Sequence, residues 1–274
     1  MIHSKSKTSI TESPSNFDNL DRMSVGELLT HINEEDARVH LAVREALPQI
    51  KNLVEHIVVR MEKGGRVFYL GAGTSGRLGV LDASEVPPTF GVPENMVIGL
   101  IAGGDVALRK SVEAAEDDPD KAWASLQGYH INKNDVVIGI AASGTTPYVI
   151  GGIKHACKNG ILTGCIVCNP GSEIAQVTEY PIEAITGPEF VTGSTRLKAG
   201  TAQKMILNMI TTSIMIKLGR VKGNKMVNMQ LTNKKLVERG TRMIVEELNI
   251  PSDEARRLLL IHGSVKKVIE AYQK

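Results

Sequence analysis

The sequence predicts an α/β fold in which a parallel sheet is flanked by helices on both faces, with a small helical cap at the C-terminal end. Short continuous apolar runs, such as Val136-Val137-Ile138, are typical of strands that are buried on both faces. These runs alternate with segments of helical periodicity, which is the pattern of βαβ units. The 274 residues, 42% of them hydrophobic, are enough to bury the core of one such domain with a small appendage.

The chain is expected to begin with a helical segment and then to alternate between strands and helices. Apolar residues recur at helical spacing from 36 to 62, with Pro48 marking a break or kink and Gly64-Gly65 the end. Strands are expected at 67–70, 96–102, 136–142, 162–168 and 180–185. Helices are expected at 76–84 and 105–116, from Pro119 onward, at 147–160 and at 198–218.

The C-terminal third sets the expected domain organisation. The helix at 198–218 is apolar nearly all round, so it must be buried in the core or at a subunit interface, and we favour the interface. Beyond Pro251, two short amphipathic segments around Gly263 predict the helical cap. We therefore expect an N-terminal helical segment at 1–56, the main α/β domain at 57–220, and a helical C-terminal region at 221–274.

Composition and charge exclude several classes of function. A net charge of +2 without a clustered basic face argues against binding to nucleic acid. No apolar run approaches the ~20 residues of a membrane span. The polar start lacks the apolar core of a signal peptide, so we expect a cytoplasmic protein, where the three cysteines would be reduced. Cys165 and Cys168 would point to opposite faces of a strand, and the histidines show no metal-ligand spacing, so no metal site is expected.

The first candidate binding loop follows the first predicted strand. Residues 71–76 match the pattern G-x-G-x-x-G, which on its own suggests a dinucleotide-binding fold. That fold also needs an acidic residue at the end of the second strand, and Asp105 comes late, beyond a glycine pair. Thr74 and Ser75 instead place hydroxyl groups inside the loop, which favours a phosphate-binding site.

A second loop of the same kind decides between the two interpretations. Ser143-Gly144-Thr145-Thr146 lies between the apolar strand at 136–142 and a helix whose first turn contains Pro147. The N-terminus of a helix offers free backbone N–H groups and a positive dipole end, and the hydroxyl groups add donors. Since both loops follow strands of one parallel sheet, they meet in one crevice, which predicts a site for one phosphate and a polar body.

Several longer segments carry a family resemblance. The chain resembles the sugar isomerase (SIS) superfamily and, more closely, the N-acetylmuramic acid 6-phosphate etherases. The resemblance runs from about residue 11 to 274, and its first and last segments are the most specific. One departure is near the start, where Thr11-Glu12-Ser13 is followed by Pro14-Ser15 instead of a basic residue and an asparagine. The matching segments are 71–94 (GAGTSGRLGVLDASEVPPTFGVPE), 99–106, 114–118, 139–152 and 193–210 (GSTRLKAGTAQKMILNMI).

The resemblance implies an SIS-type sandwich, a reaction and a set of site residues. The reaction would cleave the D-lactyl ether of N-acetylmuramic acid 6-phosphate without a metal or cofactor, in amino sugar and cell-wall recycling. Glu85 would be the acid on the lactate oxygen and Glu116 the base at carbon 2. The acidic neighbours Asp117-Asp118 would by themselves raise the pKa of Glu116 and make it the better acid, so this assignment rests on the resemblance. Phosphate and substrate would be bound by Gly73, Thr74, Ser75, Ser143, Gly144, Thr145, Thr146, Ser194 and Lys198.

The resemblance also implies a homodimer with the site near the subunit interface, and a ubiquitin-associated-like C-terminal cap. Two other functions share the fold. An aldose–ketose phosphosugar isomerase would also remove the proton at carbon 2, but it would need no second acid. A phosphosugar-sensing regulator would bind the ligand without turning it over. Substrate turnover therefore separates the three.

Overall fold

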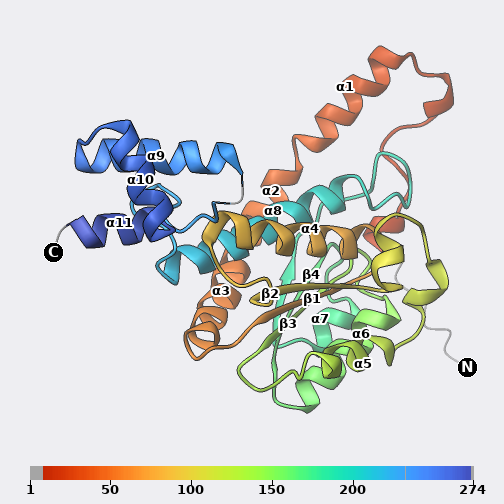
Figure 1. Cartoon of the computed structure of the whole chain (residues 1–274). Helices are drawn as coiled ribbons and strands as arrows, with labels where there is room; N and C mark the ends of the chain where they lie inside the picture. Colours follow the sequence, from red (N-terminus) through yellow and green to blue (C-terminus); the bar gives the residue numbers. More distant parts are fainter. Residues whose placement is uncertain (1–8, 232, 273–274) are drawn as a thin grey trace, which may run out of the picture.

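A parallel sheet forms the centre of the protein, as Figure 1 shows for the computed structural model, which describes residues 9–231 and 233–272. Its five strands lie in the order β2-β1-β3-β4-β5, and every neighbouring pair is parallel. This confirms the predicted sheet. The strands are β1 (Val67–Gly71), β2 (Val97–Ile101), β3 (Val136–Ile140), β4 (Leu162–Val167) and β5 (Tyr180–Glu183).

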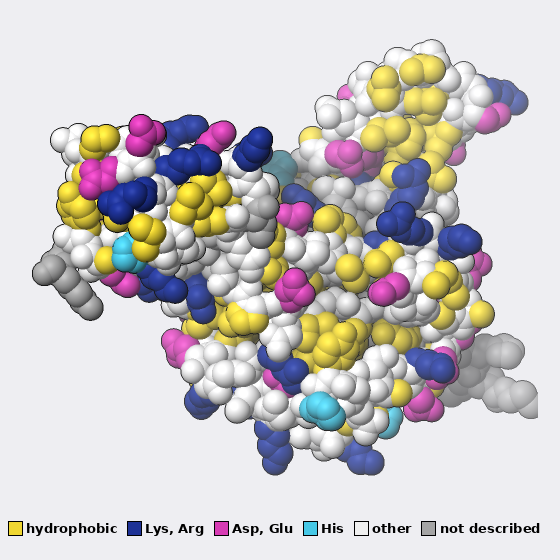
Figure 2. All heavy atoms as spheres, viewed as in Figure 1, with side chains coloured by type: hydrophobic (Ala, Val, Ile, Leu, Met, Phe, Trp, Pro, Cys, Tyr) yellow, Lys and Arg dark blue, Asp and Glu magenta, His cyan; other side chains and the backbone are white. Residues whose placement is uncertain are grey.

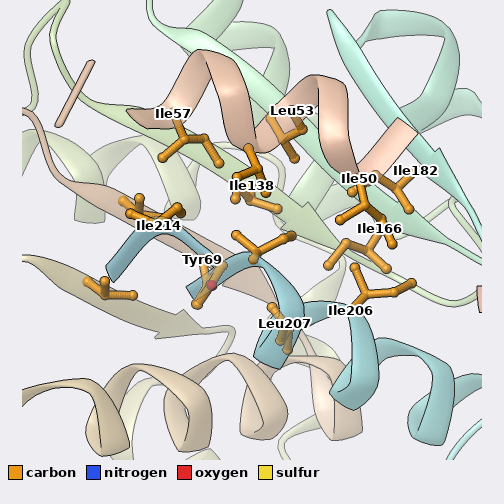
Figure 3. Close-up of a cluster of buried hydrophobic side chains, with 14 of the residues drawn as sticks. Ile50, Leu53, Ile57, Tyr69, Ile138, Ile166, Ile182, Ile206, Leu207 and Ile214 are labelled. Atoms are coloured by element: carbon orange, nitrogen blue, oxygen red, sulfur yellow. The ribbon is translucent and has the colours of Figure 1, made fainter. Parts of the chain in front are cut away.

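Helices cover both faces of the sheet, because successive strand side chains enter different cores. Tyr69 and Ile138 lie in one core with α2, α3, α4 and α8, shown in Figure 3. Phe68 and Val137 lie in the other core with α5 and α6, and α7 closes the same face. The bounds are α2 (Val39–Glu45), α3 (Leu47–Glu62), α4 (Gly73–Phe90), α5 (Lys121–Gly128), α6 (Pro147–Lys158), α7 (Glu173–Val177) and α8 (Lys198–Lys217).

The sheet itself buries α8, where we had favoured a subunit interface. Ile206, Ile210 and Ile214 are fully buried in the core that α8 shares with the sheet and α3. The opposite side of the helix is exposed, and Ile216 keeps 49% of its surface accessible. The apolar residues around the whole helix reflect its contacts with α2, α3 and α4 in addition to the sheet.

Two predicted helices differ from the structure. The segment 105–116 forms two short 3-10 turns, η3 (Gly104–Leu108) and η4 (Glu113–Glu116), because the chain between them leaves helical geometry. Helix α4 starts earlier than expected and continues through Pro87 and Pro88 to Phe90. Gly91 then ends it in the left-handed conformation. Helix α5 begins two residues after Pro119, at Lys121.

The N-terminal part forms a projecting arm. After the 3-10 turns η1 (Ile10–Glu12) and η2 (Leu20–Arg22), helix α1 (Val25–Asp36) extends away from the body (Figure 1). Ser24 and Glu27 form a capping box at its start, which satisfies N–H groups that the helix leaves free. The expected boundary after residue 56 falls inside α3, which is continuous and packs on the sheet.

The C-terminal helices pack around a small core of their own. Helices α9 (Lys234–Leu248), α10 (Ser252–His262) and α11 (Val265–Tyr272) enclose buried Ile244, Leu259 and Val268. The segment before them contacts the C-terminal end of α4, where the Gln230 N–H donates to the Pro88 carbonyl oxygen at 3.2 Å. Among the described residues, none of the helices combines the length and the apolar character that crossing a membrane requires.

Helix α4 approaches the sheet so closely that only glycine fits at residue 76. A methyl carbon there would lie 2.6 Å from Ile101 Cγ1 and 2.8 Å from the carbonyl oxygen of Gly71. Both distances are shorter than van der Waals contact, so the helix or the strand would have to move. This close contact fixes the start of α4 over the carboxyl end of β1.

We predict that Gly76→Ala lowers the free energy of unfolding by about 1–3 kcal/mol, because an added methyl group overpacks the contact between α4 and the sheet. Urea denaturation followed by circular dichroism measures this change. The matched control is Gly128→Ala at the end of α5, where an added methyl carbon meets nothing within 4 Å. Equal stability of the two variants would contradict the close contact.

Candidate functional site

The candidate site lies at the carboxyl edge of the sheet, between β1 and β3. From β1 the chain passes to β2 on one side, whereas β3, β4 and β5 follow on the other side. The loops after β1 and β3 therefore leave in opposite directions and open a crevice between them. Open α/β sheets bind their ligands at such a point.

The first loop ends in the uncapped N-terminus of α4. Gly73, with φ of +50°, already belongs to the first helical turn, and no described side chain caps this turn. The backbone N–H groups of Gly73, Thr74 and Ser75 are therefore available to an anion. The Ser75 hydroxyl is buried and donates to Gln203 Oε1 at 2.9 Å, so it fixes the loop to α8.

The second loop ends in another uncapped N-terminus, that of α6. Ser143 Oγ accepts hydrogen bonds from the backbone N–H of Thr145 at 3.2 Å and from its hydroxyl at 3.0 Å. Gly144 has φ of +71°, and a methyl carbon there would lie 2.2 Å from Ser172 Oγ. Thr146 stands at the N-cap of α6 without a side-chain cap. Two open helix N-termini thus lie at neighbouring strands.

The N-terminal segment joins the second loop through Asn169, which sequence reasoning missed. The buried amide of Asn169 donates to the Ala142 and Ser143 carbonyl oxygens, both at 3.2 Å, and to Thr11 Oγ1 at 2.9 Å. Its oxygen accepts from the Thr11 backbone N–H at 3.2 Å. Asn169 directly follows the apolar run 162–168, just as the two loops follow apolar runs, and this position in the sequence could have identified it.

The same segment continues to the chain just before α8. Glu12 lies against Gly193, since a methyl carbon on that glycine would be 3.0 Å from Glu12 Oε2. Ser15, one of the two departing residues, donates its hydroxyl hydrogen to the Phe190 carbonyl oxygen at 2.8 Å. A continuous set of contacts therefore runs from the second loop through Asn169 and the N-terminal segment to the half-buried residues 193–195.

Lys198 does not face the crevice. Its ammonium group forms a buried ion pair with Glu35 of α1, and only 2% of Lys198 and 4% of Glu35 are exposed. Burial opposes ionisation of Glu35, but the hydrogen bond and charge of Lys198 outweigh it and lower the pKa of Glu35. The side chain that we expected to face the lactate or the phosphate instead fixes α1 to α8.

The N-terminus of α8 is also closed to an anion. The buried carboxylate of Glu189 accepts hydrogen bonds from the N–H groups of Lys198 and Ala199, each at 2.9 Å. Burial raises the pKa of Glu189 even though these N–H groups favour its charged form. Ser194 is half-buried in the turn ahead of the helix, where its N–H donates to the Val191 carbonyl oxygen at 2.9 Å.

Glu116 lies beside the first loop. It lines a small cavity of about 70 Å³ together with Gly73, Arg77 and Ser111. Burial raises the pKa of Glu116, and the negative charges of Asp117 and Glu113 raise it further. A raised pKa suits a general acid, and it equally strengthens a base that works near neutral pH.

Glu85 lies far from Glu116 within the chain. It is exposed on α4, eight residues after Arg77 and twelve after Gly73, which both line the cavity of Glu116. At ~1.5 Å per residue, Glu85 lies ~12 Å and ~18 Å along the helix from them. The structure therefore places Glu116 beside the first candidate loop, whose strand neighbours that of the second loop, but it places Glu85 elsewhere. The described residues contain no group of three or more His, Cys, Asp or Glu side chains that could hold a metal ion.

Curated relatives match almost the whole chain. An N-acetylmuramic acid 6-phosphate etherase of Christiangramia forsetii is 64% identical over 97% of this chain and 97% of its own. The etherase of Cronobacter sakazakii is 52% identical over 93% of this chain and 85% of its own. The model of the glucokinase regulatory protein N-terminal SIS domain matches residues 49–157, and the SIS domain model matches residues 122–213.

Solved structures of lower identity share the fold. A phosphoheptose isomerase from Francisella tularensis has a TM-score of 0.56 and 18% identity, covering 70% of this chain and 98% of its own. A phosphoheptose isomerase from Neisseria gonorrhoeae has a TM-score of 0.52 and 16% identity, covering 70% of this chain and 98% of its own. These likenesses confirm the SIS-type arrangement of sheet and helices.

We predict that Asn169→Ala destabilises the protein by ~1–3 kcal/mol, because it leaves buried backbone groups of the second loop and of Thr11 without partners. Urea denaturation measures the loss, and limited proteolysis should show faster cleavage in the N-terminal segment. In the control Gln176→Ala, an exposed amide loses its bond to the Gly171 carbonyl oxygen, and stability should change little. Unchanged proteolysis of Asn169→Ala would count against the link.

A second prediction concerns the buried ion pair. Lys198→Met should cost about 3–5 kcal/mol by leaving the Glu35 charge buried alone, whereas the double variant Glu35→Leu/Lys198→Met should recover most of this loss. Pairing with Lys198 lowers the pKa of Glu35 in the folded protein. The ion pair therefore contributes to the free energy of unfolding above the unfolded pKa of ~4.3, and this contribution is lost as pH falls through the folded pKa. Denaturation curves at several pH values should therefore show the stability of wild type falling relative to that of the double variant as pH drops below ~4.3.

Proposed function

The chain belongs to the family of N-acetylmuramic acid 6-phosphate etherases and is an enzyme of that kind; from this premise we propose how its residues carry out the reaction. The observation that carries the proposal is the 64% identity over 97% of both chains, together with two open helix N-termini at one crevice. The relatives' names do not favour an isomerase or a sensing regulator.

The proposed reaction is an elimination followed by addition of water. In the open-chain sugar, carbon 2 lies next to the aldehyde, so its proton is acidic and a base removes it. The electron pair forms a double bond between carbons 2 and 3 as the bond from carbon 3 to the lactate oxygen breaks, and an acid protonates that oxygen. Water then adds its oxygen to carbon 3 and a proton returns to carbon 2. The products are N-acetylglucosamine 6-phosphate and D-lactate.

We assign the base to Glu116 and the acid to Glu85. The raised pKa of Glu116 supports a base that is strong enough for carbon 2, and its place beside the first loop puts it near a bound phosphosugar. Protonation of the leaving oxygen needs a separate acid, and the family resemblance supplies Glu85 for it. The two roles require the two carboxyl groups to be in opposite protonation states.

The phosphate would be held by the two loops. Backbone N–H groups of Gly73, Thr74 and Ser75 and that of Thr146 supply donors at positive helix ends. Gly144 and Thr145 shape the second loop, because their N–H groups donate to the Ala141 carbonyl oxygen and to Ser143 Oγ. The exposed hydroxyl group of Thr145 donates to Ser143 Oγ and could instead donate to the ligand, and the half-buried Ser143 hydroxyl could donate its own hydrogen, whereas Ser75 contributes through its backbone. Ser194 would contact the sugar, and Lys198 would act as a positioning residue through Glu35.

We further propose a cytoplasmic homodimer that takes part in amino sugar and cell-wall recycling. The three cysteines, all within the described residues, are free thiols, which supports a reducing compartment. Burial raises the pKa of Cys165 to about 11 and of Cys168 to about 12, so neither is poised for thiolate chemistry. We also propose that residues 1–56, 57–220 and 221–274 are the organisational units, with the continuous helix α3 joining the first two. Helices α9–α11 would form a ubiquitin-associated-like cap, and their separate core supports the last boundary.

Deuterium exchange separates the roles of the two glutamates. In heavy water, Glu85→Gln should stop D-lactate release but still exchange the hydrogen at carbon 2, because proton removal needs only the base. Glu116→Gln should abolish both, with a loss of roughly 10²–10⁴-fold. Mass spectrometry of the recovered substrate and a coupled D-lactate assay measure the two steps. The reverse pattern would make Glu85 the base and Glu116 the acid. Full activity of both variants would contradict a catalytic role for either glutamate.

The second loop is tested with a phosphorylated and an unphosphorylated substrate. Ser143→Ala should weaken binding of the phosphorylated substrate by ~1.5–3 kcal/mol, the value of one hydrogen bond to a charged group. The unphosphorylated substrate should lose little. Ser125→Ala, an exposed serine on α5, serves as the control. Steady-state KM values measure the difference, and equal losses for both substrates would mean that this loop does not hold the phosphate.

A further inference from the structure

The substrate of the proposed reaction carries two anionic groups, and the two loops account for one of them. The phosphate is on carbon 6, and the second anion is the carboxylate of the lactyl group on carbon 3. The open N-termini of α4 and α6 are assigned to the phosphate. A carboxylate that leaves water needs a charged or hydrogen-bonding partner in the protein, so the lactyl group requires a second binding point.

Two groups near the start of α8 do not supply this partner. The ammonium group of Lys198 is buried in the ion pair with Glu35. The Glu189 carboxylate already accepts the N–H hydrogens of Lys198 and Ala199. General attraction by the surface is weak as well, because the net charge is only +2 and Lys and Arg side chains are interspersed with Asp and Glu on the face in Figure 2. The partner must therefore be a particular side chain close to the reacting carbons.

Arg77 lines the same cavity of about 70 Å³ as Glu116, the proposed base at carbon 2. It comes four residues after Gly73, about one helical turn, so its side chain lies on the same side of α4 as the start of the first loop. Carbon 3, which bears the lactyl ether, is bonded to carbon 2. A base within about 3 Å of the proton on carbon 2 therefore also brings the lactyl group close to Arg77.

The guanidinium group of Arg77 is held by the segment that leads to Glu116. Its Nε donates to the Leu108 carbonyl oxygen at 3.3 Å, and its Nη2 donates to the Lys110 carbonyl oxygen at 3.5 Å. These two bonds use two of the five N–H donors of an arginine, so donors remain for a ligand. The planar fork of a guanidinium group matches a carboxylate and binds it through two parallel hydrogen bonds.

We propose that Arg77 binds the lactyl carboxylate and thereby selects phosphosugars that carry a lactyl group. The inference rests on the proposed function, which supplies the substrate and the role of Glu116. Of the described residues that line the cavity, Arg77 alone carries a positive charge, whereas Glu113 and Glu116 are acidic. Both acids would repel a lactyl carboxylate that had no cation beside it, so Arg77 allows this group to approach the base.

Two substrates separate this role from a purely structural one. The first is N-acetylmuramic acid 6-phosphate, and the second is the same compound with its lactyl carboxylate converted to a neutral carboxamide. Arg77→Gln should lower kcat/KM for the first by about 10–100-fold, mainly through a higher KM, because it removes a hydrogen bond to a charged group. Wild type should lose a similar factor on the carboxamide, and Arg77→Gln should add little to that loss.

Three further variants complete the comparison. Arg77→Lys keeps the charge but not the fork, so it should recover part of the lost kcat/KM for the natural substrate. Arg109→Gln removes an exposed arginine from the same segment as Leu108 and should leave the kinetics of both substrates unchanged. Arg196→Gln removes an exposed arginine just ahead of α8. A loss specific to the carboxylate substrate in Arg196→Gln, with none in Arg77→Gln, would overturn the proposal.

Inhibition by N-acetylglucosamine 6-phosphate provides an independent measurement, because this product keeps the phosphate but lacks the lactyl group. Its inhibition constant should be the same for wild type and Arg77→Gln, which also shows that the variant is folded. Equal losses of kcat/KM for the carboxylate and the carboxamide in Arg77→Gln would mean that Arg77 only holds the segment before Glu116, and would overturn the role of Arg77 alone. Absence of D-lactate release by wild type would instead overturn the proposed function, and this inference with it.

Discussion

The direct contact between α4 and the sheet is the constraint on which the rest of the site depends. At Gly76 the helix lies so close to β1 that no side chain fits between them. The first turn of α4 is thereby held over the carboxyl end of β1, next to the loop that follows β3. Because the helix is continuous to Phe90, the same contact also carries Glu85 far from this end. The contact at Gly76 thus positions the first candidate loop and also holds Glu85 away from Glu116.

The buried carboxylate of Glu189 makes the N-terminus of α8 unfavourable for a bound phosphate. Three helices, α4, α6 and α8, begin near the crevice, and Glu189 already occupies the N-terminus of α8. A second anion there would meet a like charge, which supports the proposal that phosphate binds at α4 and α6. Glu35 and Lys198 then fix the arm α1 to the start of α8 through an ion pair with little exposure to water. This ion pair therefore connects α1 to the first turn of α8.

Another buried carboxyl group fixes α4 against α8. Asp82 accepts hydrogen bonds from Asn208 Nδ2 at 2.9 Å, from the Thr211 hydroxyl at 3.2 Å and from the Tyr69 hydroxyl at 3.2 Å. Burial raises the pKa of Asp82, although these donors favour its charged form. The cluster joins β1, α4 and α8.

The sequence by itself determined the parallel sheet, the two Ser/Thr loops and the family, because these depend on short patterns that are read along the chain. Buried strands show as apolar runs, and helix N-termini that bind phosphate show as Gly, Ser and Thr after such runs. Only the tertiary structure decided that Lys198 pairs with Glu35 and that Asn169 joins Thr11 to the second loop. Those partners are 163 and 158 residues apart, and no local pattern encodes which distant side chains meet. The separation of Glu85 from Glu116 was likewise decided by packing, because the sequence shows two candidate glutamates but not the direction of the helix between them.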